Sequence, residues 1–317
     1  MKIITFKDIY DLGIRPAECM KWVDEMLRNK DKVLLPPKIH MALSDDIFCN
    51  VMPSVIPHEA LGHKVMGAKL VTRYPQNDPA LESVIVLMNA DNGEKLAIMD
   101  GTWITAMRTG AVAAHSIELL AVKDYTEIGV VGLGNTSRAT LAVLGDIVKD
   151  REIHIKLLKY KDYADDVIER FKDNKNFIFE VVDSMEDLAR GSQVIISGVT
   201  YAQDDFLTPE YYEEGCLIVP IHTRGFMECD LVFDKIYGDD YGHVCGFKHF
   251  KEYKYFAEVA DVLSNKAEGR INNKERIIAY NIGLSIHDMY FAGNIYGLIS
   301  KEKENYELGK PMDRIWV

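Results

Sequence analysis

Long apolar runs are missing from this 317-residue sequence, because charged residues interrupt every hydrophobic segment well before the roughly 20 residues that a membrane-spanning helix needs. The amino terminus carries too many charges for a secretory signal peptide. Cysteine is also scarce: the five cysteines are scattered and form no C-x-x-C pair. This usage is typical of reduced thiols, and we expect a cytoplasmic protein without a membrane partner.

Positive charge is in short supply. The chain has 37 lysines and arginines against 49 aspartates and glutamates, a formal net charge of −12. This balance argues against a nucleic acid as partner, and a site for an anionic small molecule must concentrate positive charge locally. No Ser-His-Asp arrangement is visible. His58 and His63 are five residues apart, which does not match the H-E-x-x-H spacing, so we expect no metal site.

A glycine turn between an apolar strand and a helix is the most informative motif that is present. Residues 128–131 form an apolar run, Gly132 and Gly134 follow, and an alanine- and leucine-rich helix is expected to about residue 148. Such a turn lets backbone N–H groups and the helix N-terminus bind a pyrophosphate. Ser137 stands where the third glycine of G-x-G-x-x-G is usual, and an ordinary strand–turn–helix remains the alternative.

The pattern of the chain changes near residue 120. Before it, a helix is expected over residues 7–30, then mostly antiparallel strands, with Asn92-Gly93 marking a hairpin. After it, strands and helices alternate, which indicates a parallel sheet. We predict an α/β protein: a Rossmann-type doubly wound parallel sheet over 121–290, and a mainly antiparallel α+β domain over 1–120 completed by 291–317. The expected strands of the parallel sheet are 128–132, 153–159, 177–182, 193–197 and 216–221, and the expected helices are 105–122, 135–148, 163–172, 185–190, 208–213 and 274–290.

Five residues could carry chemistry or bind a charged substrate. Lys69 lies inside an apolar strand pattern, with a strand-edge lysine in solvent as the alternative. Arg108 lies near the start of the helix that precedes the glycine motif, and Lys38 follows two prolines. Asp230 follows the fifth strand of the parallel sheet, where a carboxylate faces the ligand crevice unless it only caps a helix. His222, beyond the same strand, could also line that crevice.

The end of the second parallel strand bears on the choice of dinucleotide. An acidic residue there binds the ribose 2′-hydroxyl and favours NAD. This sequence has Lys159, Tyr160 and Lys161 at that point, and two lysines could hold a 2′-phosphate. We therefore favour NADP. The alternative is that the lysines are solvated and Asp162 reaches the ribose, which would favour NAD.

Several stretches together resemble the ornithine cyclodeaminase/μ-crystallin family, in the family's order and over nearly the whole chain. The resemblance implies a dinucleotide-binding domain, a substrate-binding domain that also makes a homodimer, and NAD(P)-dependent chemistry on amino acids or imines. The matching stretches are Pro36-Pro-Lys, Met52-Pro-Ser, Gly67-Ala-Lys-Leu-Val-Thr, Tyr74-Pro-Gln-Asn, Leu96-Ala-Ile-Met-Asp-Gly, Thr105-Ala-Met-Arg-Thr-Gly-Ala, Gly132-Leu-Gly-Asn-Thr and Gly283-Leu-Ser-Ile-His-Asp.

The resemblance implies a role for each matching residue. Lys69 would contact the substrate near the reacting carbon, and Asp230 would be the catalytic acid–base. The substrate would be bound by Arg108, Lys38 and Met52, and the cofactor by Thr109, Gly132, Gly134, Asn135, Thr136, Lys159, Tyr160 and Lys161. Lys38 replaces a usual arginine, the loop from Pro220 to Phe226 departs from the cyclodeaminase version, and Asn281 replaces a usual serine. These departures leave the substrate open, ornithine in particular.

The expected activity is hydride transfer between nicotinamide and the α-carbon of an amino acid or its imine. Release of ammonia would make the protein a dehydrogenase, the reverse direction an imine reductase, and attack by a side-chain amine a cyclodeaminase. The alternatives are a μ-crystallin-like protein that binds NADP and a small ligand with little turnover, and an opine-type dehydrogenase of amino acid conjugates. The retention of Lys69, Arg108 and Asp230 favours an enzyme.

Overall fold

The structure is a computed structural model that describes residues 1–200, 202–299 and 304–307. Its internal contacts divide the chain into two compact units. The first unit comprises Met1–Ile14, Lys32–Thr105 and the chain from Ser285 on, and the second comprises Arg15–Asp31 and Ala106–Leu284. The two units are described separately below. Among the described residues, no helix is both long and apolar enough to cross a membrane.

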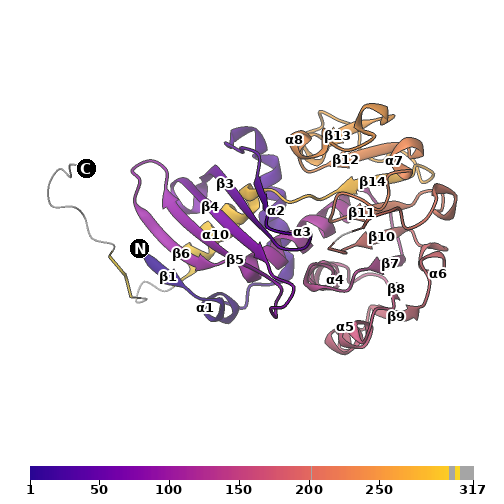
Figure 1. Ribbon diagram of the computed structural model, residues 1–317, viewed down its shortest axis with the longest axis horizontal. Coiled ribbons are helices and arrows are strands. Elements are labelled where there is room, and N and C mark those ends of the chain that lie inside the picture. Colours follow the sequence, from indigo (N-terminus) through magenta and orange to yellow (C-terminus); the bar gives the residue numbers. More distant parts are fainter. Residues whose placement is uncertain (201, 300–303, 308–317) are drawn as a thin grey trace. The chain divides into compact units, whose positions relative to one another are not determined.

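The first unit is a six-stranded sheet with one long helix against it (Figure 1). The strands have the order β1-β6-β5-β4-β3-β2; β1 is parallel to β6 and the other neighbours are antiparallel. The C-terminal helix packs on β3, β4 and β5, so residues that are remote in sequence share one core. The elements are β1 (Lys2–Ile4), α1 (Phe6–Asp11), β2 (Ile39–Ala42), β3 (Phe48–His58), β4 (His63–Arg73), β5 (Leu81–Asn89), β6 (Lys95–Asp100) and α10 (Ser285–Leu298).

Alternation of side chains determines which face of this sheet is covered. In β4, Val65, Lys69 and Val71 are buried while Leu70 between them is exposed. The expected hairpin is confirmed: β5 and β6 pair antiparallel, and Gly93 in the connection has φ +76°, a conformation that favours glycine. A lysine therefore points to the buried side of this sheet.

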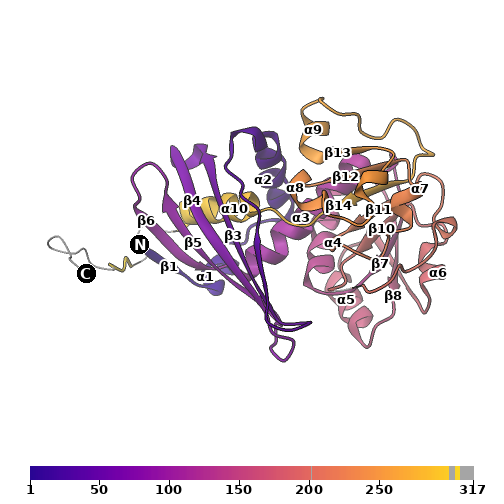
Figure 2. The same ribbon diagram turned by 45° about the horizontal axis from the view of Figure 1, so that its top comes forward.

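The second unit contains an eight-stranded, all-parallel sheet (Figure 2). Its order is β13-β12-β14-β11-β10-β7-β8-β9, so the strand order reverses direction between β7 and β10. This is the topology of a doubly wound dinucleotide-binding sheet, whose ligand crevice lies at the reversal. The predicted fold class is confirmed. The strands are β7 (Glu127–Val131), β8 (Ile153–Leu158), β9 (Phe177–Val182), β10 (Val194–Ser197), β11 (Leu217–Pro220), β12 (Lys235–Gly238), β13 (Phe256–Glu258) and β14 (Ile277–Tyr280).

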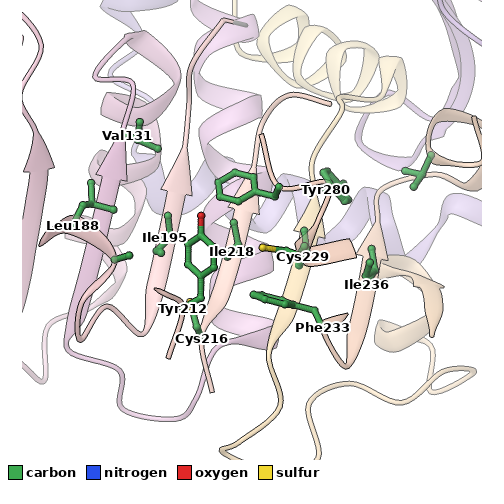
Figure 3. Packing of buried hydrophobic residues seen from close by; sticks show 14 of the residues in the cluster. Val131, Leu188, Ile195, Tyr212, Cys216, Ile218, Cys229, Phe233, Ile236 and Tyr280 are labelled. Atoms are coloured by element: carbon green, nitrogen blue, oxygen red, sulfur yellow. The ribbon is translucent and has the colours of Figure 1, made fainter. Parts of the chain in front are cut away.

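The second unit also contains helices, and one of them, α3, begins in the first unit and continues into the second. The helices are α2 (Pro16–Arg28), α3 (Thr102–Leu120), α4 (Asn135–Ile147), α5 (Tyr163–Phe171), α6 (Met185–Ala189), α7 (Cys229–Val232), α8 (Tyr241–Val244) and α9 (Val259–Leu263). Figure 3 shows the core on one part of the sheet, where Ile195, Ile218 and Ile236 from three strands pack with Tyr212 and Phe233. All the residues of β10, β11, β12 and β14 are buried, as expected for central parallel strands.

Three expected helices differ from the structure. The helix predicted over 274–290 is wrong: Ile277–Tyr280 is the central strand β14, and α10 begins only at Ser285 after Gly283, whose φ is +93°. The helix predicted over 7–30 is two helices separated at Gly13, and α2 begins at Pro16. The helix predicted over 208–213 is a single 3-10 turn, Pro209–Tyr211.

The unit boundaries also fall at other residues than the sequence suggests. Helix α2 belongs with the parallel sheet because it packs on α4 and α9. Asp146 in α4 accepts hydrogen bonds from Arg15 Nη2 at 2.7 Å and from the Ala17 N–H at 3.0 Å. The assignment of the first unit to substrate binding and dimerisation, and of the second to the cofactor, stays a prediction.

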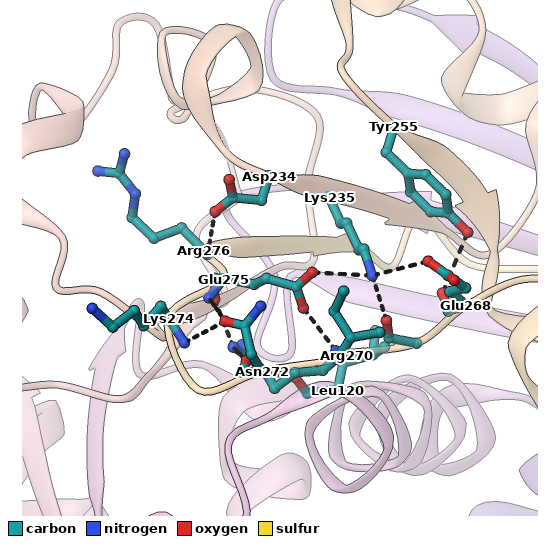
Figure 4. A network of polar contacts seen from close by, with 12 residues as sticks. Leu120, Asp234, Lys235, Tyr255, Glu268, Arg270, Asn272, Lys274, Glu275 and Arg276 are labelled. Carbon is teal, nitrogen blue, oxygen red and sulfur yellow. Dashed lines mark hydrogen bonds and ion pairs between the residues drawn. The ribbon is translucent and has the colours of Figure 1, made fainter.

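A network of hydrogen bonds and ion pairs links side chains and loops at the amino-terminal edge of the parallel sheet (Figure 4). Lys235, at the start of β12, is buried and lies 3.1 Å from Glu275 Oε1 and 2.7 Å from the Gly269 carbonyl oxygen. Arg270 donates to the carbonyl oxygens of Leu120 and Glu275 at 2.7 and 2.6 Å. These bonds hold the segment that leads into β14 at the edge opposite to the glycine turn.

Candidate active site

The glycine turn after β7 is tightly built on the neighbouring strand end. Gly132 has φ +78°, and a Cβ there would lie 2.6 Å from backbone atoms of Gly198 and Val199, which follow β10. Ser137 Oγ donates to the Gly132 carbonyl oxygen at 2.5 Å, and a Cβ on Gly198 would collide with that hydroxyl. The serine at the third glycine position therefore closes the turn and requires a glycine on the next strand.

The beginning of α4 has the properties of an anion site. Gly134, at the N-cap, provides no side-chain hydrogen bond to the helix, and a Cβ built on it would meet no atom within 4 Å. Asn135 and Thr136 open the 13-residue helix, and Asn135 is exposed. The first N–H groups of a helix lack intrahelical acceptors and carry the positive end of the dipole. The open space at Gly134 thus fits a dinucleotide pyrophosphate approaching the backbone.

Two lysines follow the second parallel strand, as the sequence indicates. Lys159 comes directly after β8, and its Nζ lies 3.4 Å from Asp183 Oδ1, both side chains being largely exposed. Lys161 adopts φ +50°, with its Nζ 5.3 Å from the centre of the Tyr160 ring. Asp162 is the N-cap residue of α5 but makes no side-chain cap bond. The loop thus presents lysines where an NAD-binding site usually has its acidic residue.

Arg108 and Thr109 are buried on α3, with 6% and 8% of their surface exposed. The Arg108 guanidinium packs directly on Gly283, where a Cβ would lie 2.6 Å from Nη1. Gly283 also donates its N–H to Asp239 Oδ2 at 2.6 Å. Glycine at position 283 therefore leaves room for the Arg108 guanidinium, and it can adopt the positive φ of +93° that the backbone has there. The next residue of α3, Gly110, allows close approach to the backbone of α4.

Asp230 lies on the short helix α7, beyond the carboxyl end of β11, and is 2% exposed. Its Oδ1 accepts a hydrogen bond from Tyr280 Oη at 2.8 Å, and its Oδ2 accepts one from Tyr253 Oη at 3.2 Å. Burial disfavours the carboxylate more than the two phenol bonds favour it, and raises the pKa of Asp230 to about 7. This carboxyl group can therefore accept and donate a proton near neutral pH.

His222 lies beyond β11 and is paired with the last residue of β10. Its Nε2 is 2.6 Å from Ser197 Oγ, and the ring lies near Phe206 and Phe226. Burial lowers the pKa of His222 to about 4, so the imidazole is neutral at physiological pH. At that position it can offer a hydrogen bond but no charge.

In the first unit, Lys69 is fully buried on the covered face of the sheet. Its Nζ lies 2.7 Å from Asp288 Oδ1 on α10, and both side chains are 0% exposed. Met52 is its cross-strand neighbour on β3 and is also buried. The alternative of a lysine head in solvent is therefore wrong. Lys38 lies just before β2 and is partly exposed.

Within each unit the structure brings some predicted residues together. It joins Met52 with Lys69, and it gathers the glycine turn and Asp230 at the carboxyl edge of the parallel sheet. The sequence interpretation missed Tyr253 and Tyr280, and it included Asp288 only as the last residue of the stretch Gly283-Leu-Ser-Ile-His-Asp, without a role. A signal for Asp288 existed, because it is the one Asp, Glu, Lys or Arg in the α10 sequence. The assigned roles of all these residues stay predictions.

Comparisons with known proteins agree with this architecture. The family described as ornithine cyclodeaminase/mu-crystallin matches residues 5–303. The nodulation efficiency protein NfeD of Rhizobium meliloti is 24% identical, over 93% of this chain and 94% of the relative. The structure of Thermococcus litoralis Δ1-pyrroline-2-carboxylate reductase in complex with NADH and L-proline is similar at TM-score 0.81 and 21% identity, covering 94% and 97% of the two chains. An archaeal alanine dehydrogenase dimer with bound NAD is similar at TM-score 0.79 and 22% identity, covering 94% and 95%.

Proposed function

Because the chain belongs to the ornithine cyclodeaminase/mu-crystallin family, we propose that it is an NAD(P)-dependent enzyme acting at the α-carbon of an amino acid or its imine. One observation carries the proposal: Asp230 is a buried carboxyl group, with its pKa raised to about 7, at the carboxyl edge of a dinucleotide-type sheet. Buried acids with pKa values near the working pH are typical of general acid–base sites. The similar reductase that holds NADH and L-proline supports the same substrate class.

The residues of the chain then have distinct tasks. The nicotinamide, when bound, supplies or accepts the hydride. Arg108 binds the α-carboxylate through charge-assisted hydrogen bonds, assisted by Lys38. Asp230 takes a proton from the amine or the water when the amino acid is oxidised, and returns it in the opposite direction. Lys69 stabilises negative charge that develops on the substrate, a role whose loss typically costs on the order of 10² to 10³ in rate.

The function is tested by a screen that reads two signals. Amino acids are incubated with NAD and NADP, and keto acids with ammonia or cyclic imines with the reduced cofactors. Nicotinamide absorbance reports net redox, and product mass reports cyclodeamination, which leaves the cofactor unchanged. We expect turnover with at least one pair, and its loss in Asp230→Asn. Cofactor and ligand binding without any product would instead support the binding-protein alternative and overturn the enzyme.

We propose NADP as the preferred cofactor. Lys159 and Lys161 support this, since two cations near the ribose favour a 2′-phosphate, although Asp183 offsets the charge of Lys159. NADPH should bind at least about tenfold more tightly than NADH, roughly 1.4 kcal/mol, and its advantage should shrink with added salt. Lys161→Ala should reduce the preference, while Lys172→Ala, at the end of α5, should leave it unchanged. Equal affinities in the wild type would refute the assignment.

We propose that the protein is a homodimer formed through its antiparallel sheet. The face opposite α10 carries a row of cross-strand apolar neighbours, Ile39, Val51, Leu70 and Val84. Three of them, Ile39, Leu70 and Val84, are 57%, 37% and 38% exposed. Apolar patches of this kind mark interfaces. Light scattering should give a dimer at micromolar concentration, and Leu70→Lys should weaken it; a monomeric wild type would contradict the proposal.

We also propose a reducing compartment, the cytoplasm, for this protein. The five cysteines are all free, and Cys19, Cys216 and Cys229 are buried with their thiol pKa values raised by burial. Buried, protonated thiols are poor partners for disulfide exchange. Mass spectrometry of the protein from its own cells should find five free thiols, and a disulfide would overturn the expectation.

A further inference from the structure

Both carboxyl oxygens of Asp230 are engaged by tyrosine hydroxyls that come from separate parts of the second unit. Tyr280 is the last residue of β14, and Tyr253 lies between a 3-10 turn and β13. The two phenols donate to different oxygens, at 2.8 and 3.2 Å. A carboxylate held in this way has a fixed position. Any proton exchange at this carboxyl group therefore takes place beside two phenol hydroxyls.

The three residues differ in their access to the surface. Asp230 and Tyr280 are 2% and 1% exposed, whereas Tyr253 is only partly buried. Burial and the neighbouring Asp230 raise the pKa of both tyrosines, so each phenol stays protonated in the working range. A neutral phenol can pass on its own proton while it takes another, without forming a phenolate. Of the trio, Tyr253 has the exposure and the bond geometry for that task.

Two other titratable groups, His249 and Asp205, act on this carboxyl group. His249 attracts the carboxylate, and Asp205 disfavours it. Neither is bonded to it: His249 Nδ1 lies 3.1 Å from Glu252, and Asp205 accepts the N–H groups of Met227 and Glu228 at 2.7 and 2.6 Å. The phenols of Tyr253 and Tyr280 therefore hydrogen-bond the Asp230 carboxyl group directly, and Tyr253 is the one that bonds its Oδ2.

We propose that Tyr253 relays protons between the substrate and Asp230, while Tyr280 positions the carboxyl group. In the oxidative direction, an N–H bond of the amine or an O–H bond of water breaks and leaves its electron pair on that nitrogen or oxygen. Its proton bonds to Tyr253 Oη as the original phenol proton moves to Asp230 Oδ2. Asp230 becomes neutral, Tyr253 is unchanged, and the reverse direction returns the proton. This inference rests on the proposed function.

The test compares three phenylalanine variants in steady-state turnover across pH. Tyr253→Phe should lower kcat by on the order of 10²-fold, within the range of general acid–base effects, with cofactor binding unchanged. The loss of kcat should persist at high pH, because the variant lacks the hydroxyl that carries the proton. Added imidazole should partly restore kcat, because it can carry the proton instead. Tyr280→Phe removes a donor to the carboxylate, so the basic form should appear at higher pH and kcat should recover there. Tyr255→Phe is the matched control: its hydroxyl bonds the Glu268 carbonyl oxygen at 3.3 Å, and kcat should change less than twofold.

The outcomes distinguish a failure of the proton relay from a failure of the proposed enzymatic function. Wild-type turnover establishes the function first. If Tyr253→Phe then keeps the wild-type kcat, or regains it fully at high pH, Tyr253 is not a relay although the enzyme stands. If the wild type turns over no substrate, the proposed function fails and the relay falls with it. A persistent loss with imidazole rescue in Tyr253→Phe alone supports the relay.

Discussion

Replacement of Asp230 by asparagine should abolish turnover and yet stabilise the folded protein at neutral pH. The carboxyl group titrates near pH 7 in the fold, against 3.8 for an ordinary aspartate. Between these values the folded chain holds one proton more than the unfolded chain, so wild-type stability falls as the pH rises. An amide cannot ionise, and its oxygen and N–H₂ group can still bond the two tyrosine hydroxyls.

The magnitude follows from the same two pKa values. Each pH unit between them is worth about 1.4 kcal/mol, and the loss levels off above pH 7. Between pH 5 and pH 8 the free energy of unfolding of Asp230→Asn should therefore rise by roughly 2–3 kcal/mol relative to that of the wild type. Urea denaturation at closely spaced pH values measures this difference. Asp173→Asn, at an exposed carboxylate, should run parallel to the wild type; parallel curves for Asp230→Asn as well would refute the buried, neutral carboxyl group.

Three further changes probe the other parts of the site. Arg108→Ala should weaken apparent substrate affinity roughly 10- to 100-fold while cofactor affinity, measured by fluorescence titration, stays constant; an unchanged substrate affinity would show that Arg108 does not bind the substrate carboxylate. Gly132→Ala should lower the melting temperature, since its Cβ meets backbone at 2.6 Å, whereas Gly134→Ala, in open space, should preserve the melting temperature and weaken cofactor binding. Asp288→Asn should lower the free energy of unfolding in urea by about 3–5 kcal/mol, because Lys69 loses a buried carboxylate that lies 2.7 Å from its Nζ, and Lys69→Met in the same chain should recover much of that loss.

The local sequence pattern was sufficient to predict the strand before the glycine turn and the next two strands after it. Apolar runs bounded by turns mark β7, β8 and β9, and these strands follow one another along the chain as neighbours in the sheet. The turn itself is a local feature, since Gly132, Gly134 and Ser137 lie within six residues. Close approach to Gly198 is different, because nothing near Gly198 in the sequence shows that a serine side chain packs on it.

The sequence interpretation failed where long-range pairing determines the structure. Residues 277–280 are short and wholly apolar, a pattern that fits a buried strand or a helix segment equally well. Their position between β11 and β12 decides for a strand, and no neighbouring residue reports that position. The contact of Tyr280 with Asp230 could not be predicted from the sequence for the same reason. It forms only because β14 lies in the centre of the sheet.

The buried ionisable side chains Lys69, Asp288 and Asp230 are of two kinds. Lys69 and Asp288 form a buried pair of opposite charges inside the first unit, so removing one charge takes a close counter-charge from the other. Asp230 is bonded to two neutral phenols, which satisfy its oxygens and cancel no charge. A fold gains little stability from such a carboxyl group, because burial keeps it protonated to about pH 7. Burial of Asp230 as a carboxylate is unfavourable, and its raised pKa lets it exchange a proton near neutral pH. A catalytic role explains such a residue better than a packing role does, so we favour Asp230 over Lys69 as the acid–base residue.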